Sequence, residues 1–126
     1  LTRSMYGQFA EYHTSADNLD FVTPRSLQES LEMYIEVIRT YEANCKFSRP
    51  KPFCEPQMGR YDLYREKGGA GEDNLDDMVQ QRMWILNYAD GKTDLLDISE
   101  KSGFDIFSLQ SASKALISNG LITKVK

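Results

Sequence analysis

The stretch "ILNYADGKTDLLDISEKSGFDIFSLQSASKALISNGLI" (residues 85–122) carries the most regular pattern of helix boundaries in the 126-residue chain. Asp94 and Asp105 each precede an apolar segment, and an aspartate in that position commonly caps a helix by accepting a hydrogen bond from its first turn. Gly103 follows the first segment, where a glycine commonly ends a helix. We therefore expect a short helix between Asp94 and Gly103 and a longer one over residues 106–118.

The elements on either side complete the pattern. The apolar side chains of the 106–118 helix that we expect to point inward are Leu109, Ala112, Leu116 and Ile117. An Asn-Gly pair closes this helix, and "LITKVK" (residues 121–126) predicts a short strand. Upstream, Asn74 can cap a helix through about Ala89, and "DGKT" (residues 90–93) indicates a turn. Helix, turn, short helix, tight turn, helix and strand is the order typical of a winged-helix domain.

A second, longer helix is predicted over residues 24–44. Thr23 can cap it, and Pro24 is well tolerated at the first helical position. Apolar side chains follow at steps of three and four, at Leu27, Leu31, Tyr34, Ile35, Ile38 and Tyr41. This spacing places them on one face of the helix, and such a face normally packs against another surface.

The segment between the two helical regions has a different composition. Residues 44–74 contain three of the four prolines and half of the eight glycines, which is typical of a connector. We therefore divide the chain into residues 1–46, a Pro/Gly-rich connector at 47–73, and a winged-helix-like domain at 74–126. The predicted fold class is mainly α with minor β, in which a long amphipathic helix joins a three-helix, helix-turn-helix domain.

Composition and charge exclude several classes of protein. The chain is 40% hydrophobic and 27% charged, values that are ordinary for a globular protein. A net charge of −4 and a pI of 5.0 argue against a general polyanion binder. Since no apolar run approaches the roughly 18 residues of a membrane span, we expect no membrane association and a cytoplasmic location.

Neither the cysteines nor the basic cluster between the helices predicts a specific site. Cys45 and Cys54 could pair, but reduced thiols are the expected state in a cytoplasmic protein. The cluster formed by Lys46, Arg49 and Lys51 could be a phosphate patch, but we interpret it as a solvated loop.

His13, the only histidine, stands in "EYHTSADNLDFV" (residues 11–22) and has two interpretations. It could be a metal ligand or a general base, with Asp17 orienting the imidazole. It could equally be a loop histidine among local turn contacts. Spacing alone favours the loop.

The same residues nevertheless resemble a known family. "YHTSADNLDFV" followed by a proline-initiated amphipathic helix resembles the end of the catalytic domain in zinc-dependent aminopeptidase-like proteins. "CEPQMGRYDLYREKGG" (residues 54–69) resembles the segment that joins this domain to a C-terminal winged helix in one subgroup, and residues 85–122 resemble that winged helix. Residues 1–46 would then be the last part of an aminopeptidase-like domain.

The resemblance implies a role for two residues and a zinc ion in the parent family. His13 matches the last zinc ligand of the family, and Asp17 matches the aspartate of its motif. The other ligands and the catalytic carboxylates have no counterpart in this chain. Because a catalytic zinc site needs three protein ligands and an open position, we expect this chain to be a C-terminal fragment with no enzyme activity and no cofactor.

The winged-helix segment allows two functions. In the first, the 106–118 helix would bind the major groove of DNA through its outward residues Ser108, Gln110, Ser111 and Lys114. Charge disfavours this function, because residues 72–126 hold six basic against nine acidic side chains, a balance of −3. In the second, the domain is a protein-interaction module.

We therefore predict an interaction module, with DNA binding as the alternative. The contact would be made with a protein partner or, through the 24–44 helix, with a second copy of the chain. Because an exposed apolar stripe is an association site, we expect a homodimer.

Overall fold

The computed structural model describes residues 2–64 and 73–125 of the chain. The chain forms two compact units, Leu1–Arg39 and Thr40–Lys126, and each unit is considered by itself.

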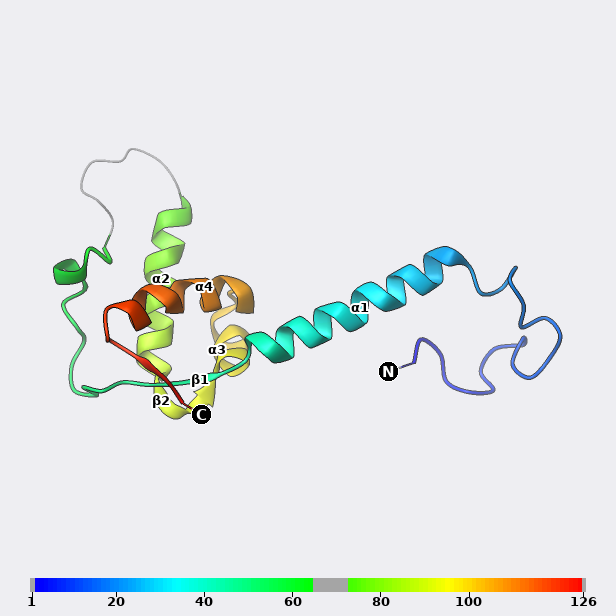
Figure 1. The fold of residues 1–126 in the computed structure, drawn as a ribbon, viewed down its shortest axis with the longest axis horizontal. Helices are drawn as coiled ribbons and strands as arrows, with labels where there is room; N and C mark the ends of the chain where they lie inside the picture. The colour runs from blue at the N-terminus through cyan, green and yellow to red at the C-terminus, as the bar shows by residue number, and fades with distance from the viewer. Residues whose placement is uncertain (1, 65–72, 126) are drawn as a thin grey trace. The chain divides into compact units, whose positions relative to one another are not determined.

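In its described residues the second unit contains three α-helices, as the sequence predicted, and a small sheet (Figure 1). Its elements in chain order are β1 (Lys46–Ser48), the 3-10 helix η1 (Met58–Tyr61), α2 (Asp73–Tyr88), β2 (Asp90–Asp94), α3 (Leu95–Ser102), α4 (Ile106–Ser118) and β3 (Thr123–Val125). The predicted fold class, mainly α with minor β and a winged-helix-like unit, is confirmed.

The boundaries of α3 and α4 follow the side chains that predicted them, whereas α2 begins at Asp73, one residue before the Asn74 that was predicted to cap it. Asp94 accepts a hydrogen bond from the backbone nitrogen of Asp97 (2.9 Å), and the Asp97 side chain accepts one from the backbone nitrogen of Asp94 (3.4 Å). This reciprocal pair is a capping box at the start of α3. At the other end, Gly103 adopts a positive φ of 77°, which a glycine tolerates without strain. Asp105 caps α4 by accepting from the backbone nitrogen of Ser108 (2.9 Å).

The sheet was only partly predicted. Its strand order is β2-β1-β3, and both pairings are antiparallel. The sequence "DGKT", interpreted as a turn, lies in β2, where the Asp90 carboxylate accepts from the backbone nitrogens of Lys92 and Thr93. The central strand, β1, lies in a segment for which no strand was predicted. Three-residue strands contain too few residues to show an alternating pattern, and this explains the omission.

The core of this unit is formed by apolar side chains of the helices, β1, η1 and the loops. Among the residues whose burial the structure describes, the large side chains that are buried most completely are Met58, Ile85, Leu95, Ile98, Leu109, Leu116 and Ile122. Trp84 packs on the edge of this core and stacks with Tyr88 at a ring distance of 5.7 Å. Ile117, predicted to point inward, is 42% exposed. Leu116 and Ile117 are consecutive and about 100° apart around the helix, so both cannot lie at the centre of the buried face.

The first unit contains turns followed by most of helix α1 (Pro24–Ala43). Thr23 caps this helix as predicted, because its hydroxyl oxygen accepts from the backbone nitrogen of Ser26 (3.2 Å). Before the helix, residues 2–22 form turns and bends, in which the rings of Phe9 and Phe21 stack at 5.7 Å. Arg3 reaches from this segment to the Glu29 carboxylate (2.8 Å) and so attaches the turns to the helix.

The Asp94 cap leads to a prediction about stability and pH. Partial burial raises the pKa of Asp94, but hydrogen bonds from Asp97, Asn44 and Leu96 together lower it by more. The pKa of Asp94 therefore lies below its ordinary value. A lowered pKa in the folded state stabilises the fold above the ordinary carboxyl pKa of about 4, and this contribution is lost as the pH falls from that value through the lower pKa of the folded state. We expect Asp94→Ala to lower the free energy of unfolding by about 1 kcal/mol at pH 7 and by less at pH 3.

Urea denaturation followed by circular dichroism at both pH values measures this difference. Asp94→Asn is the matched control, because asparagine also caps helices well but carries no charge. An equal loss of stability for Asp94→Ala at pH 7 and pH 3 would contradict the electrostatic part of the prediction.

Candidate functional site

His13 lies in an exposed turn of the first unit. Its backbone φ is 58°, a left-handed conformation that histidine adopts more often than most residues. The turn is closed by Thr14, whose backbone nitrogen and hydroxyl both donate to the carbonyl of Glu11 (3.1 and 2.8 Å). The imidazole stacks on the ring of Tyr12 with centroids 4.2 Å apart. These contacts account for the position of His13 as part of a local turn.

The residues around His13 do not fit a zinc ion by themselves. Asp17 is exposed, and its backbone nitrogen donates to the carbonyl of Thr14 (3.2 Å). Among residues 2–64 and 73–125, no group of three or more His, Cys, Asp or Glu side chains lies close enough together to hold a metal ion. Since a catalytic zinc needs three protein ligands, these described residues alone do not supply a catalytic zinc site. The assignment of His13 as a family zinc ligand and of Asp17 as its partner stays a prediction.

The α4 residues proposed to contact DNA differ in their exposure. Ser111 and Lys114 are exposed, whereas Ser108 and Gln110 are half-buried. Ser108 contributes to the start of the helix, where its hydroxyl donates to the carbonyl of Asp105 (2.7 Å). The outward face of α4 therefore presents one cation, at Lys114.

The predicted apolar face of α1 is exposed. Leu27, Leu31 and Ile38 have 60%, 59% and 56% of their surface accessible, and Tyr41 has 82%. The sequence predicted this set of side chains by its spacing. We name Leu27, Leu31, Tyr34, Ile35 and Ile38 the α1 apolar face.

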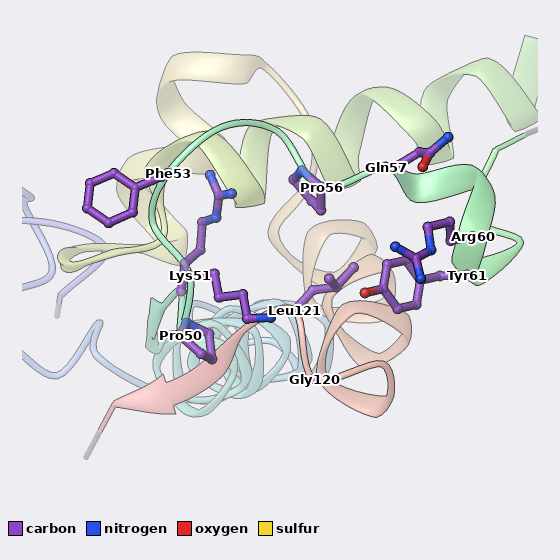
Figure 2. A pocket seen from close by; sticks show the side chains of 10 residues that line it. Pro50, Lys51, Phe53, Pro56, Gln57, Arg60, Tyr61, Gly120 and Leu121 are labelled. Atoms are coloured by element: carbon purple, nitrogen blue, oxygen red, sulfur yellow. The ribbon is translucent and has the colours of Figure 1, made fainter.

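A pocket beside the end of α4 was not predicted. Its walls come from the loop after β1, from η1 and from the Gly120-Leu121 turn, and its volume is about 240 Å³ (Figure 2). Arg49 and Lys51, interpreted from the sequence as part of a solvated loop, both line it. The sequence could not indicate the pocket, because its walls are about 60 residues apart in the chain.

The cysteine thiols are unpaired. Cys45 and Cys54 are both free, in agreement with the expectation of reduced thiols. Cys45 is half-buried, and its burial raises the pKa of the thiol above its ordinary value, so the protonated form is favoured.

Three helices and a three-stranded sheet in this order define the second unit as a winged helix. Comparison with known families agrees, because residues 45–124 match the winged helix-turn-helix family. The chain therefore belongs to the winged helix-turn-helix family. Residues 1–44 match a different family, a domain of unknown function named DUF4910.

Two similar proteins from Clostridium acetobutylicum match this chain across both of these regions. One carries the provisional name polysaccharide biosynthesis protein with aminopeptidase-like domain; it is 43% identical over 116 residues, which are 92% of this chain and 26% of that protein. The other is the crystal structure of a provisionally named peptidase, with a TM-score of 0.70 and 38% identity over 93% of this chain and 24% of that one. The resemblance to aminopeptidase-like proteins that carry a winged helix is confirmed, and the chain spans about a quarter of the length of either relative.

In residues 2–64 and 73–125, no helix is long and apolar enough to cross a bilayer.

Proposed function

We propose that this chain is a non-catalytic interaction module of an aminopeptidase-like protein, and that the α1 apolar face joins two copies of the chain into a homodimer. The observation that carries the proposal is the exposure of this face, since a contiguous row of exposed apolar side chains is rare on a monomer and marks an association site.

The spacing of the face favours a second helix as its partner. Within this face, Leu27, Leu31, Tyr34 and Ile38 follow one another at steps of four, three and four residues. This is the spacing by which two α-helices pack side by side along a shallow left-handed crossing. A second copy of α1 offers the same row of side chains, so the two faces are complementary.

The absence of catalysis in this chain is proposed from its ligand set. A single histidine cannot supply the three-ligand site by which a zinc hydrolase lowers the pKa of its bound water. Any peptidase activity of a longer protein would then need groups that lie outside these 126 residues.

The dimer is tested by sedimentation velocity at increasing protein concentration. We expect a species of twice the 14.5 kDa chain mass, and we expect Leu31→Lys combined with Ile38→Lys to convert it to monomer, because two cations would have to be buried in the contact. Glu32→Lys combined with Glu36→Lys is the control, since it adds lysines on the opposite side of α1 and should leave the dimer intact. A monomer at every concentration would overturn the proposed contact.

DNA binding through α4 is the second candidate, and it is favoured by the exposure of Ser111 and Lys114 on the second helix of the helix-turn-helix. The same samples can be titrated against labelled duplex DNA by fluorescence anisotropy at low and near-physiological salt. Binding that weakens steeply with salt and on Lys114→Ala would establish this function in place of the interaction module. We expect no saturable binding near physiological salt, because one cation on α4 releases too few counterions.

A further inference from the structure

The pocket beside the end of α4 concentrates positive charge on an acidic protein. Ten residues line it: Arg49, Pro50, Lys51, Phe53, Pro56, Gln57, Arg60, Tyr61, Gly120 and Leu121. Three of these side chains are cationic and none is a carboxylate, whereas the whole chain has a net charge of −4. The pocket therefore has a positive local potential that attracts anions, although the chain as a whole is acidic.

Two of the cations are available to a ligand. In the part of the chain that the structure describes, the ion pairs are both made by Glu29, so neither Lys51 nor Arg60 is paired with a carboxylate. The neighbouring carboxylate of Glu55 does not line the pocket and accepts a hydrogen bond from the Tyr64 hydroxyl (3.2 Å). Lys51 and Arg60 are both exposed, so they can be neutralised by a ligand from solvent.

The third cation shapes the pocket. The Arg49 guanidinium donates to the carbonyl of Cys54 and so ties together the two ends of the loop that carries Lys51 and Phe53. A guanidinium held by a backbone carbonyl keeps its charge and its remaining N–H groups, so Arg49 adds positive potential while fixing the loop.

The second wall of the pocket, formed by η1, is anchored in the core. Met58, at the start of η1, is completely buried, and the backbone nitrogen of Leu63 donates to its carbonyl (3.1 Å). Arg60 and Tyr61 lie on this anchored turn, and Figure 2 shows the Tyr61 hydroxyl and the Lys51 side chain directed toward Leu121 from either side. A ligand would thus meet donors on two walls that are already positioned before it binds.

We propose that this pocket is a binding site for a phosphate monoester attached to a small apolar or aromatic group. A phosphate monoester carries nearly two negative charges and three acceptor oxygens at pH 7, so it can be contacted from both walls at once. Arginine binds phosphate through paired N–H groups, and lysine binds it as a point charge. A carboxylate carries one charge and two coplanar oxygens, so it would contact the hydrogen-bond donors of only one of the two walls.

The apolar part of the ligand follows from the remaining lining. Tyr61, Leu121 and the two prolines offer apolar and aromatic surface around the cations, whereas Phe53 lies at the edge of the pocket with its ring directed away from it (Figure 2). A volume of about 240 Å³ lies below the usual range for pockets that hold drug-sized molecules, so the ligand is a phosphate with one ring or a short chain. None of the lining residues belongs to the α1 apolar face, and the proposal does not depend on the proposed dimer.

The test is a titration of the full ¹⁵N-labelled chain with phenyl phosphate, followed by two-dimensional NMR at constant ionic strength. We expect saturable shifts confined to the amides of the lining residues, with a dissociation constant of about 0.1–1 mM. Lys51→Ala combined with Arg60→Ala should weaken binding at least tenfold, and both positions are exposed, so the variant should fold normally. Lys92→Ala combined with Lys114→Ala removes two cations outside the pocket and should leave the affinity unchanged.

Two further probes separate the parts of the ligand. Inorganic phosphate should bind more weakly than phenyl phosphate at the same amides, because it lacks the ring. Benzoate has the ring and a single charge, and it should bind at least tenfold more weakly. Equal affinity for benzoate, or unchanged affinity in the Lys51→Ala and Arg60→Ala variant, would overturn the assignment of a phosphate site.

Discussion

Replacing Leu116 with alanine is expected to lower the free energy of unfolding of this chain by about 2–5 kcal/mol. Leu116 is completely buried in α4, within the core of the second unit, and truncation leaves a cavity that the surrounding side chains fill only in part. Because small domains are stabilised by only about 5–15 kcal/mol in total, this change should move the urea midpoint strongly.

Ile117 supplies the matched control on the same helix. Its side chain is 42% exposed, so Ile117→Ala should cost about 1 kcal/mol or less. Both variants can be compared by urea denaturation followed by circular dichroism. If Ile117→Ala destabilised the chain as much as Leu116→Ala, the orientation of α4 described above would be wrong.

This pair of residues also shows what the sequence could predict about the helices. Caps identified the ends of α3 and α4 because the stabilising contact lies within a few residues of the cap, as at Asp94, Gly103 and Asp105. The facing of α4 was harder to predict, because counting apolar residues placed Ile117 inside. Ser113, a polar residue of the same helix, is buried although Ile117 is not. Its hydroxyl donates to the Gln110 carbonyl (2.7 Å), and this hydrogen bond satisfies the polar group inside the core.

The sheet illustrates the opposite case. β1 pairs Lys46 with Asp94 on one side and with Val125 on the other, so its partners lie about 50 and 80 residues away. A three-residue strand gains its stability from those distant partners and from burial of Phe47, and neither is visible in the local sequence. The polar sequence of β2 was interpreted as a turn because its pairing with β1 is likewise not visible in the local sequence.

The candidate sites divide in the same way. The α1 apolar face was predicted because helical periodicity is local, and its members are exposed in the structure. The phosphate pocket joins residues 49–61 to the Gly120-Leu121 turn, and only the packing of the loop after β1 against the end of α4 brings them together. Its cations were visible in the sequence, but the shared cavity was not.

The largest expected effect of a single substitution outside α4 is that of Phe47→Ala. Phe47 is the central residue of β1, the middle strand of the sheet, and only 2% of its surface is exposed. Truncating a buried phenylalanine typically costs about 3–5 kcal/mol, so we expect the variant to be largely unfolded at temperatures where the parent chain is folded. Thermal and urea denaturation of the two proteins measure the difference.

Phe53 gives the control, since it lies in the loop after β1 and is 86% exposed. Phe53→Ala should change the free energy of unfolding by less than about 0.5 kcal/mol, because little apolar surface is lost from the interior. A polypeptide that begins at Asn74 lacks both Phe47 and the strand between β2 and β3, and it should fail to fold cooperatively. If that shorter polypeptide were as stable as residues 40–126, the sheet would contribute little, and the winged helix would be held together by its three helices alone.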